Sequence, residues 1–310
     1  MTNPFRAGAA LILGFALQAH GMLFWNEDNS ANLTDPGTGV PWGSVGKVTN
    51  SGLTLLSGSA IYLGNGYLLS ANHVTMNATY SFVSFDGVST FQIDPSFNDG
   101  SRTAGKQVAT NVDMAVFKLT TIPSGLTAVN LLATPDELVA SSTLVGWGVG
   151  RNPLTPLEST SVPWGSDSTS AKRWGLNEPK ALANITYGSG SYEALVAYAG
   201  GTGGAFSPGG LGDSEASATL YDSGSGLFQQ ISGQWYLIGL TTEVDQLNTT
   251  LFGNDQAATP HGDASYFVRI STYDSQIMAL IPEPSAAAML AMAAAICMLL
   301  LRRRFALQHP

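Results

Sequence analysis

The chain has 310 residues, of which 44% are hydrophobic and 11% charged, and its 13 basic and 22 acidic residues give a formal net charge of −9. This acidic balance argues against a nucleic-acid-binding protein, because an acidic surface repels a phosphate backbone. The 35 glycines, together with many Ser, Thr and Val residues, disfavour helices and favour short strands joined by turns. We therefore expect an all-β fold, built as one large unit or as two smaller ones.

The N-terminal segment 1–21 predicts a secretory signal peptide. Arg6 is its only charge, residues 7–17 are continuously apolar or small, and Ala19-His20-Gly21 offers a small-x-small cleavage site before Met22. The alternative is a buried N-terminal helix, although no polar face interrupts the apolar run. The pattern therefore indicates an exported protein.

Residues 22–41 predict a polar lead arm without periodicity, and a pattern of short apolar runs and turns begins at Trp42. An apolar run at 60–63, the break Gly64-Asn65-Gly66 and a second run at 67–69 predict a β-hairpin. Residues 120–136 suit a connection between two halves, and 150–170 a long loop. Ser271 is a candidate cap for a short helix ending near residue 280. Further strands are expected at 80–85, 114–119, 143–147, 194–199 and 235–240.

The C-terminal segment combines three features. Pro282-Glu283-Pro284 precedes an apolar run at 285–301, and Arg302 to Arg304 follow it. The run has about 17 residues, the lower limit for a transmembrane helix, and the arginines are expected to stay cytoplasmic. The combination over 282–304 resembles the PEP-CTERM sorting tail of bacterial exported proteins, which implies recognition and removal by an exosortase-type membrane enzyme. An ordinary C-terminal anchor is the alternative.

Cysteine and charge further limit the chemistry of the exported part. The only cysteine, Cys297, lies in the apolar tail, so residues 22–281 offer no disulfide, Cys nucleophile or Cys-ligated metal. Residues 1–21 and 285–310 hold four of the basic residues, Arg6 and Arg302 to Arg304, and none of the acidic ones. The exported part is therefore more acidic than the whole chain.

Two histidines remain once the terminal segments are set aside. His73 follows the apolar run 67–69 at the start of a loop, where a rigid scaffold presents a base to a cleft. His261 lies in a polar turn with no framing strand. Asp113 directly precedes the apolar run 114–119, so its carboxylate is expected to be partly buried and paired, and an imidazole N–H is a suitable partner. Taken singly, each of these residues is also compatible with a purely structural role.

Ser223 is the candidate nucleophile. It is followed by Gly224-Ser225-Gly226, small residues that allow a tight turn and let a substrate carbonyl approach backbone N–H donors. Ser214 is a weaker candidate, because Glu215 and Ala216 stand where glycines would be needed. The chain contains no G-x-S-x-G motif, which argues against an α/β-hydrolase.

Three segments together carry a family resemblance. Residues 69–73, 113–116 and 222–226 are similar to the signatures of the trypsin-like serine proteases around the catalytic His, Asp and Ser, and they occur in that family's order. The resemblance covers about residues 42–281. It implies two six-stranded antiparallel β-barrels, about 42–125 and 136–270, with a terminal helix at 271–281 and an active site between the barrels. Supporting matches lie at 145–148, 238–240 and 266–269.

The resemblance also implies a role for each site residue. Ser223 would be the nucleophile, His73 its base and Asp113 the acid that orients the base. The backbone N–H groups of Tyr221 and Ser223 would form the oxyanion hole. Tyr221 departs from the family, which usually has glycine there, and a bulky residue adopts the backbone angles of glycine at a cost.

Two further positions follow from the resemblance. Ser217, six residues before Ser223, would lie at the base of the specificity pocket, where its neutral side chain gives no reason to prefer Lys or Arg. Asp222 would need a buried partner, which in many members of the family is a new N-terminal amine. No Arg or Lys lies between residues 22 and 46, so we expect Asp222 to be satisfied without zymogen cleavage.

The sequence therefore predicts a serine endopeptidase of the bacterial envelope or exterior, acting on proteins or peptides without a metal or organic cofactor. Its expected partners are a sorting enzyme at the tail and the membrane at 285–301, but not nucleic acid. The main alternative is a catalytically impaired protease-fold module for binding or adhesion, which Tyr221 favours. A purely structural envelope protein leaves the three motifs unexplained.

Overall fold

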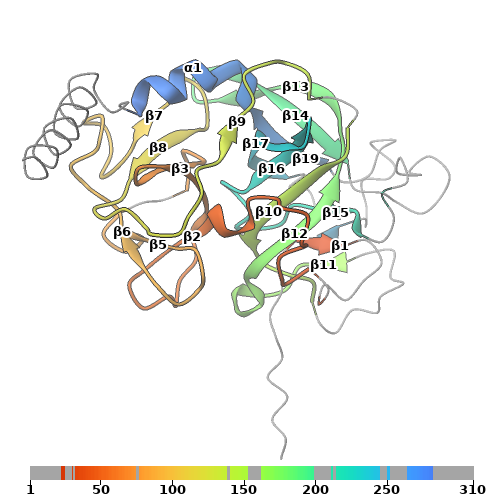
Figure 1. Cartoon of the computed structure of the whole chain (residues 1–310), viewed down its shortest axis with the longest axis horizontal. Coiled ribbons are helices and arrows are strands. Elements are labelled where there is room, and N and C mark those ends of the chain that lie inside the picture. The colour runs from red at the N-terminus through yellow and green to blue at the C-terminus, as the bar shows by residue number, and fades with distance from the viewer. Residues whose placement is uncertain are drawn as a thin grey trace, which may run out of the picture.

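Within the residues that the structure describes, the regular elements are mostly β-strands, and one α-helix, α1 (Ile270–Leu280), follows the last of them (Figure 1). The computed structural model describes residues 22–24, 30, 32–74, 77–137, 140–152, 162–198, 211, 214–244, 250–251 and 264–281. The predicted signal peptide, the tail 282–304 and His261 lie outside these residues. Within the described ranges, no helix is long and apolar enough to cross a membrane.

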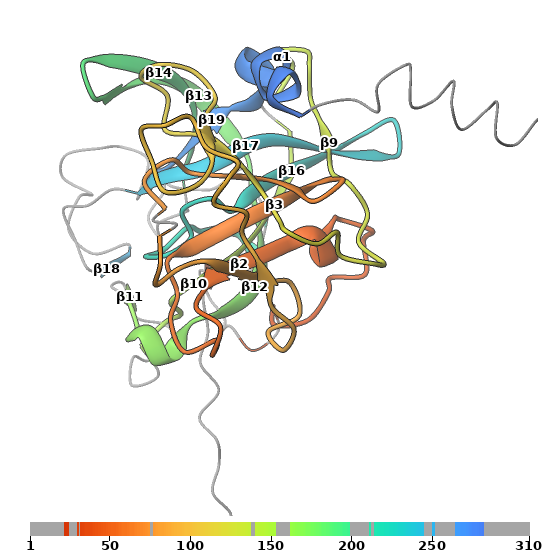
Figure 2. The same ribbon diagram turned by 90° about the vertical axis from the view of Figure 1, so that its left-hand side faces the viewer.

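The N-terminal half forms one antiparallel sheet in the order β6-β5-β2-β3-β4-β8-β7. An antiparallel bridge from Ile93, just after β6, to Leu119, just after β8, closes six of these strands into a barrel and leaves β7 on the side. Figure 2 faces this barrel, in which β2 and β3 are labelled. The strands are β2 (Val45–Thr49), β3 (Gly58–Gly64), β4 (Tyr67–Ser70), β5 (Phe82–Ser84), β6 (Phe91–Gln92), β7 (Lys106–Gln107) and β8 (Ala115–Lys118).

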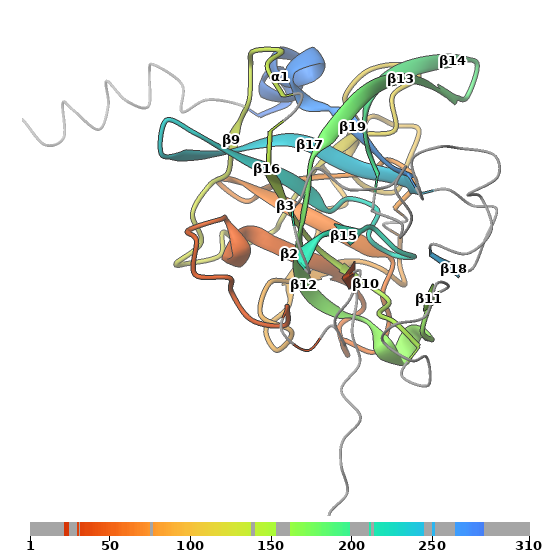
Figure 3. The ribbon, with the colours of Figure 1, turned by 90° about the vertical axis from the view of Figure 1, so that its right-hand side faces the viewer.

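The C-terminal half forms a second sheet in the order β12-β10-β16-β17-β19-β14-β13, with β9 also paired to β17. β12 and β13 are separated only by Glu178, so the two end strands of this eight-stranded sheet follow each other in the chain and the sheet curls back on itself as a second barrel. Figure 3 shows β13 and β14 extending beyond it as a long hairpin. The strands are β9 (Asn130–Leu131), β10 (Ser142–Gly148), β12 (Ala171–Asn177), β13 (Pro179–Tyr187), β14 (Gly190–Tyr198), β16 (Gly226–Ile231), β17 (Gln234–Val244) and β19 (Ala264–Arg269).

Side chains alternate between two cores, as the pleat of a strand requires. In β3, Ala60 and Tyr62 pack inside the first barrel, whereas Ile61 joins a buried cluster that draws on both barrels. In β10, Leu144 packs inside the second barrel, whereas Val145 joins the shared cluster. The barrels are therefore packed against each other through apolar side chains. They are joined by a mostly exposed connection over residues 120–129.

The lead arm is not the loose segment that its polar sequence predicts. β1 (Leu23–Phe24) pairs antiparallel with β15 (Ala216–Ser217), and Met22 and Phe24 are fully buried. The ring of Phe24 meets that of Trp174 edge to face at 5.5 Å. The arm thus binds the second barrel at the strand that leads towards Ser223. A further short pair, β11 (Val162–Pro163) with β18 (Thr250–Leu251), lies at the edge of the described residues.

The predicted hairpin and strands are present, as β3 with β4, β5, β8, β10, β14 and β17. The predicted helix is α1, but the role expected of Ser271 is wrong. The helix is capped at Arg269 without a side-chain hydrogen bond, and Ser271 lies inside it. Its hydroxyl instead donates to the buried carboxylate of Glu137, which also pairs with Arg269 at 2.7 Å.

Candidate active site

Neighbouring strands of the first barrel place His73 and Asp113 at one edge. β4 and β8 are antiparallel with Ser70 opposite Ala115, so the turn after β4 and the residue pair before β8 meet. His73 lies in that turn, and Asp113 lies two residues before Ala115. Ser223 comes from the second barrel, in the loop between β15 and β16. The structure therefore brings the three candidate residues together where the barrels meet.

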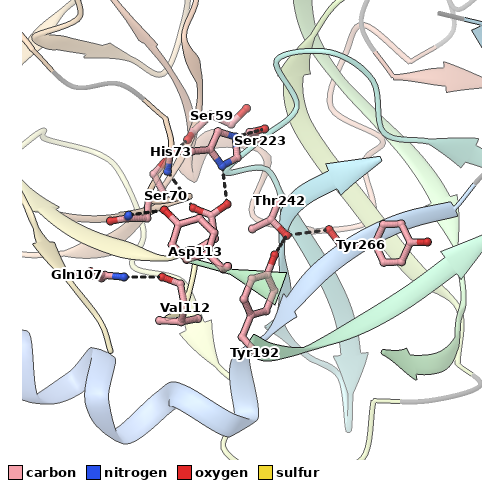
Figure 4. Close-up of polar contacts among 12 residues, drawn as sticks. Ser59, Ser70, His73, Gln107, Val112, Asp113, Tyr192, Ser223, Thr242 and Tyr266 are labelled. Carbon is pink, nitrogen blue, oxygen red and sulfur yellow. Dashed lines mark hydrogen bonds and ion pairs between the residues drawn. The ribbon is translucent and has the colours of Figure 1, made fainter. Parts of the chain in front are cut away.

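The three side chains form a hydrogen-bonded chain (Figure 4). His73 Nδ1 lies 2.5 Å from Asp113 Oδ2, and His73 Nε2 lies 2.8 Å from Ser223 Oγ. The backbone amide of His73 also donates to Asp113 Oδ1 at 2.9 Å. One carboxylate thus holds both the backbone and the ring of His73. The Nε2 edge of the ring therefore faces Ser223.

The charge on Asp113 determines the tautomer of the ring. A carboxylate only accepts hydrogen bonds, so Nδ1 carries the proton and Nε2 offers its lone pair to the Ser223 hydroxyl. Burial lowers the pKa of His73, but the hydrogen bond and the charge of Asp113 outweigh it, so the pKa is raised. Asp113 is 2% exposed, whereas the His73 side chain is 43% exposed. The imidazole of His73 therefore reaches solvent, whereas the carboxylate paired with it does not.

Backbone contacts from both barrels hold the loop around Ser223. The Ser59 amide of the first barrel donates to the Ser223 carbonyl at 2.8 Å, and the Gly224 amide donates to the Thr241 carbonyl at 2.8 Å. Gly224 has φ +82°, and a Cβ at this position would collide with the Ser59 carbonyl. Only glycine fits such a close approach in this conformation, which explains why the small residue follows the serine.

Tyr221 occupies a backbone conformation that favours glycine. Its φ is +70°, a region in which a side chain is strained. Within the described residues, neither its amide nor that of Ser223 donates a hydrogen bond, so both N–H groups are available beside the serine hydroxyl. Tyrosine in place of glycine at position 221 therefore makes this turn costly in energy, while the backbone keeps a conformation typical of glycine.

Asp222 is completely buried and is held from within the chain. The amide and hydroxyl of Thr219 donate to its Oδ2 at 2.7 and 3.0 Å. Burial raises the pKa of Asp222 to about 7, against the opposing effects of the Thr219 hydrogen bonds and the charge of Arg173. Glycines at 146 and 148 make room for this loop, since a Cβ on Gly148 would strike the Asp222 carboxyl group.

Arg173 is a buried cation that sequence reasoning did not identify. It lies on β12 directly opposite Gly146 and is completely buried. Burial lowers its pKa to about 8, and the charge of Asp222 partly offsets this. Its guanidinium makes no hydrogen bond within the described part of the chain. The charge of Arg173 therefore complements that of Asp222 without direct contact.

The remaining predicted residues lie apart from the hydrogen-bonded chain. Ser217 is fully buried in β15, its hydroxyl 3.0 Å from that of Ser265, so its place in a specificity pocket stays a prediction. The base meets Ser223, not Ser214. Beside Ser223 lies an open cavity of about 450 Å³, whose described lining is His73, Trp164, Thr219, Leu220, Tyr221, Ser223, Thr241, Thr242, Glu243 and Val244.

Further polar groups lie near the buried carboxylate of Asp113, and no local sequence pattern indicates them. The Tyr192 hydroxyl donates to Thr242 Oγ1 at 2.9 Å (Figure 4). Asn72 donates to the Tyr187 hydroxyl at 2.7 Å. These tyrosines lie on β14 and β13 of the second barrel, so their position depends on how the barrels meet rather than on any local motif.

No protein-family model matches the chain, and no curated protein matches its sequence. Among solved structures, it is similar to neuropsin, a serine protease of mouse brain, with 14% identity and a TM-score of 0.49 over 81% of this chain and 98% of that one. It is also similar to an inactive serine-to-alanine variant of Rv3671c from M. tuberculosis H37Rv, with 11% identity and a TM-score of 0.48 over 81% and 94%. A third is the HtrA-type protease AlgW with a decapeptide, with 15% identity and a TM-score of 0.44 over 73% and 52%.

The architecture itself defines the fold class. Two antiparallel β-barrels, a candidate site where they meet and a short C-terminal helix are the architecture of the chymotrypsin-like fold. The chain therefore has a chymotrypsin-like fold.

Proposed function

We propose that the protein is a serine endopeptidase that uses Ser223, His73 and Asp113 as its catalytic triad. The observation that carries this proposal is the continuous hydrogen-bonded chain from Asp113 through His73 to Ser223. In a protease fold, this arrangement is the one needed to remove a proton from a serine hydroxyl and to stabilise the resulting imidazolium.

The proposed reaction has two stages. Ser223 Oγ attacks the peptide carbonyl while His73 Nε2 takes its proton, and the same nitrogen then protonates the leaving amine. The amides of Tyr221 and Ser223 stabilise the negative charge that develops on the carbonyl oxygen. Water then hydrolyses the acyl-enzyme, with His73 again acting as base. Asp113 holds the ring in the reactive tautomer throughout.

A serine-directed fluorophosphonate tests the proposal. The purified full chain should be labelled, and peptide mapping should locate the label on Ser223. Ser223→Ala and His73→Ala should abolish both labelling and peptide hydrolysis, whereas Ser214→Ala and His261→Ala should leave them largely intact. Labelling of Ser214 would identify a different nucleophile. A folded chain that is neither labelled nor active would favour the impaired binding module instead.

We further propose that cleavage does not require Lys or Arg before the scissile bond. Ser217 supplies no carboxylate at the expected base of the specificity pocket, and it is buried among neutral partners. Small or apolar residues are therefore expected at that position. A peptide-library profile dominated by Lys and Arg there would contradict this.

The proposed location is outside the cytoplasmic membrane, with transient anchoring by residues 285–301. Its support is the sequence alone: the apolar N-terminal segment, and the PEP-CTERM-like pattern that implies an exosortase-type partner. Replacing Arg302 to Arg304 with Glu should disturb retention or processing. Unchanged export and tail cleavage in that variant would contradict the sorting-tail interpretation.

A further inference from the structure

One carboxylate in the active-site cavity takes no part in the chain from Asp113 to Ser223. Glu243 lies near the end of β17, and its side chain lines the cavity of about 450 Å³ together with His73 and Ser223. The other described residues of the lining, apart from His73, are neutral. Glu243 is therefore the only acidic side chain in the described wall of the cavity.

Within the described residues, Glu243 lacks an ion-pair partner of the kind that Glu137, Glu193 and Asp113 have. Glu137 and Glu193 pair with Arg269 at 2.7 and 2.6 Å, and Asp113 pairs with His73. Half-buried Glu243 makes no hydrogen bond or ion pair within the described residues. Burial raises its pKa, the charge of Asp113 raises it further, and His73 has the opposite effect. A carboxylate that is partly removed from water is stabilised by a nearby cation.

The strand that carries Glu243 has an unpaired edge towards the cavity. The Thr241 amide and carbonyl pair with Ser225 and Gly224 of the nucleophile loop. Beyond Thr241, the described pairing of β17 is with β19 alone, with Glu243 opposite Tyr266. An extended peptide that reaches Ser223 therefore has room to lie along this edge, since an unpaired strand offers backbone donors and acceptors.

The spacing along β17 places Glu243 away from the attacked bond. A strand rises by about 3.3 Å per residue, but the register of β17 shifts between Thr241 and Glu243, which lie opposite the adjacent residues Phe267 and Tyr266. Glu243 therefore lies roughly 3.3 Å farther along the sheet than Thr241, which contacts the nucleophile loop. This corresponds to about one residue of an extended peptide. The side chain of the residue that supplies the attacked carbonyl would lie nearer Tyr221 and the oxyanion-hole amides.

We propose that Glu243 is a specificity-determining residue, whose carboxylate binds the cationic side chain of a Lys or Arg that flanks the scissile bond. The cation occupies a position other than that of the residue supplying the attacked carbonyl. The effect of Glu243 on cleavage rates rests on the proposed function, whereas its effect on peptide binding does not. The preferred substrate is thus a peptide segment that contains a Lys or Arg near the scissile bond. The basic residue is not the one that supplies the attacked carbonyl.

Positional scanning tests the proposal on the purified full chain. In a set of otherwise neutral peptides, Lys is compared with norleucine at each position from four before to two after the scissile bond. The kcat/KM ratio for Lys over norleucine should be about five- to tenfold at one flanking position. It should fall towards one in Glu243→Gln and decrease as NaCl rises from about 0.05 to 0.5 M, because salt screens charges. Asp136→Asn removes an exposed carboxylate outside the cavity and should keep the ratio.

Binding provides a readout that does not depend on catalysis. The same peptides are titrated calorimetrically into Ser223→Ala, with and without Glu243→Gln. Tighter binding of the Lys peptide that requires Glu243 supports the proposal even if no hydrolysis is found, in which case only the proposed function fails. Equal binding of the two peptides overturns the proposal. So does a Lys preference that persists in Glu243→Gln or one confined to the position of the attacked carbonyl.

Discussion

At the scale of single residues, the backbone and the side chain of Tyr221 have opposite effects, because its φ is positive. The backbone of this residue offers an amide beside Ser223, while its side chain makes the conformation costly. The strained residue lies at the turn where the proposed oxyanion hole needs two amides directed at one oxygen. Tyr221 is also part of the cavity lining, so its ring has a place in the cleft that a glycine would leave empty.

Tyr221→Gly should stabilise the protein and Tyr221→Ala should not. Glycine adopts φ +70° without strain, which should raise the free energy of unfolding by about 1 kcal/mol. Alanine removes the ring but keeps the strained Cβ, so it serves as the matched control. Thermal denaturation of the three proteins measures the effect. If both variants shift the melting temperature alike, the ring rather than the backbone determines the stability of this turn.

The pH dependence of activity should reflect the raised pKa of His73. The base accepts a proton only when neutral, so kcat/KM should rise with pH through a midpoint above 6.5, the usual value for histidine. The charge of Glu243 also raises the pKa of His73. Glu243→Gln should therefore move the midpoint of the profile towards lower pH. Profiles of kcat/KM on one neutral peptide provide the measurement. A midpoint below 6.5 in the parent protein would show that burial, not Asp113, dominates.

At the scale of elements, the short pairing of β1 with β15 connects the start of the described chain to the nucleophile loop. β15 ends at Ser217, and Thr219 and Asp222 follow within the same turn. The two residues of β1 bury Phe24 against Trp174 of β12. The arm therefore covers the segment that leads into the site, although it contributes no residue to the cavity lining.

Phe24→Ala should destabilise the protein by about 3 kcal/mol, the lower end of the range for a completely buried phenylalanine. It should also lower activity below its own melting transition, because β15 loses the strand that packs against it. Val88→Ala, at a valine that is 79% exposed, should change neither property. Melting curves and peptide hydrolysis at one temperature test both effects. An unaltered melting temperature in Phe24→Ala would mean that the arm contributes little to folding.

The elements differ in how clearly the sequence predicts them. β3 and β4 were predictable because two apolar runs flank Gly64-Asn65-Gly66. β12 and β13 were not, because residues 171–187 mix buried, half-buried and exposed positions and include Pro179, so their strand character comes from pairing with β10 and β14. Polar lead residues likewise gave no hint that Phe24 would be buried.

The residues of the candidate site also differ in how clearly the sequence predicts them. His73, Asp113 and Ser223 each adjoin a strong local pattern, so the sequence singled them out before any geometry was known. Arg173 and Glu243 lie in no motif. Arg173 owes its place near Asp222 to the register of β12 against Gly146, and Glu243 owes its place to the course of β17 past the nucleophile loop. Such long-range positions follow from tertiary packing, which a single sequence does not display.

At the scale of the whole molecule, the burial of Asp222 bears on how the protein becomes active. Thr219 donates two hydrogen bonds to this carboxylate, and Arg173 supplies a compensating positive charge. These partners are present in the chain without any new terminus. A cut at Lys47-Val48 would divide β2, a central strand of the first barrel.

We therefore expect the form that begins at Met22 to be active without further cleavage. N-terminal sequencing of the species labelled by a fluorophosphonate provides the measurement, and Arg173→Met should reduce labelling because Asp222 loses its compensating charge. An active species that starts at Val40 or Val48, accompanied by an inactive Met22 form, would contradict this expectation.

The connection over residues 120–129 joins the two barrels, and the candidate catalytic residues lie on both sides of it in the chain. His73 and Asp113 precede it and Ser223 follows it, and nothing lies within 4 Å of a side chain built on Gly125. The gene should therefore be divisible at Gly125 into two fragments that are each silent and that restore hydrolysis when fused to interacting partners. Mixing such fragments and measuring peptide cleavage would test this, and activity in either fragment alone would contradict it. The shared apolar cluster and the hydrogen bonds between the barrels, such as that from the Ser59 amide to the Ser223 carbonyl, would then hold the two fragments together. The divided molecule would act as a reporter of proximity.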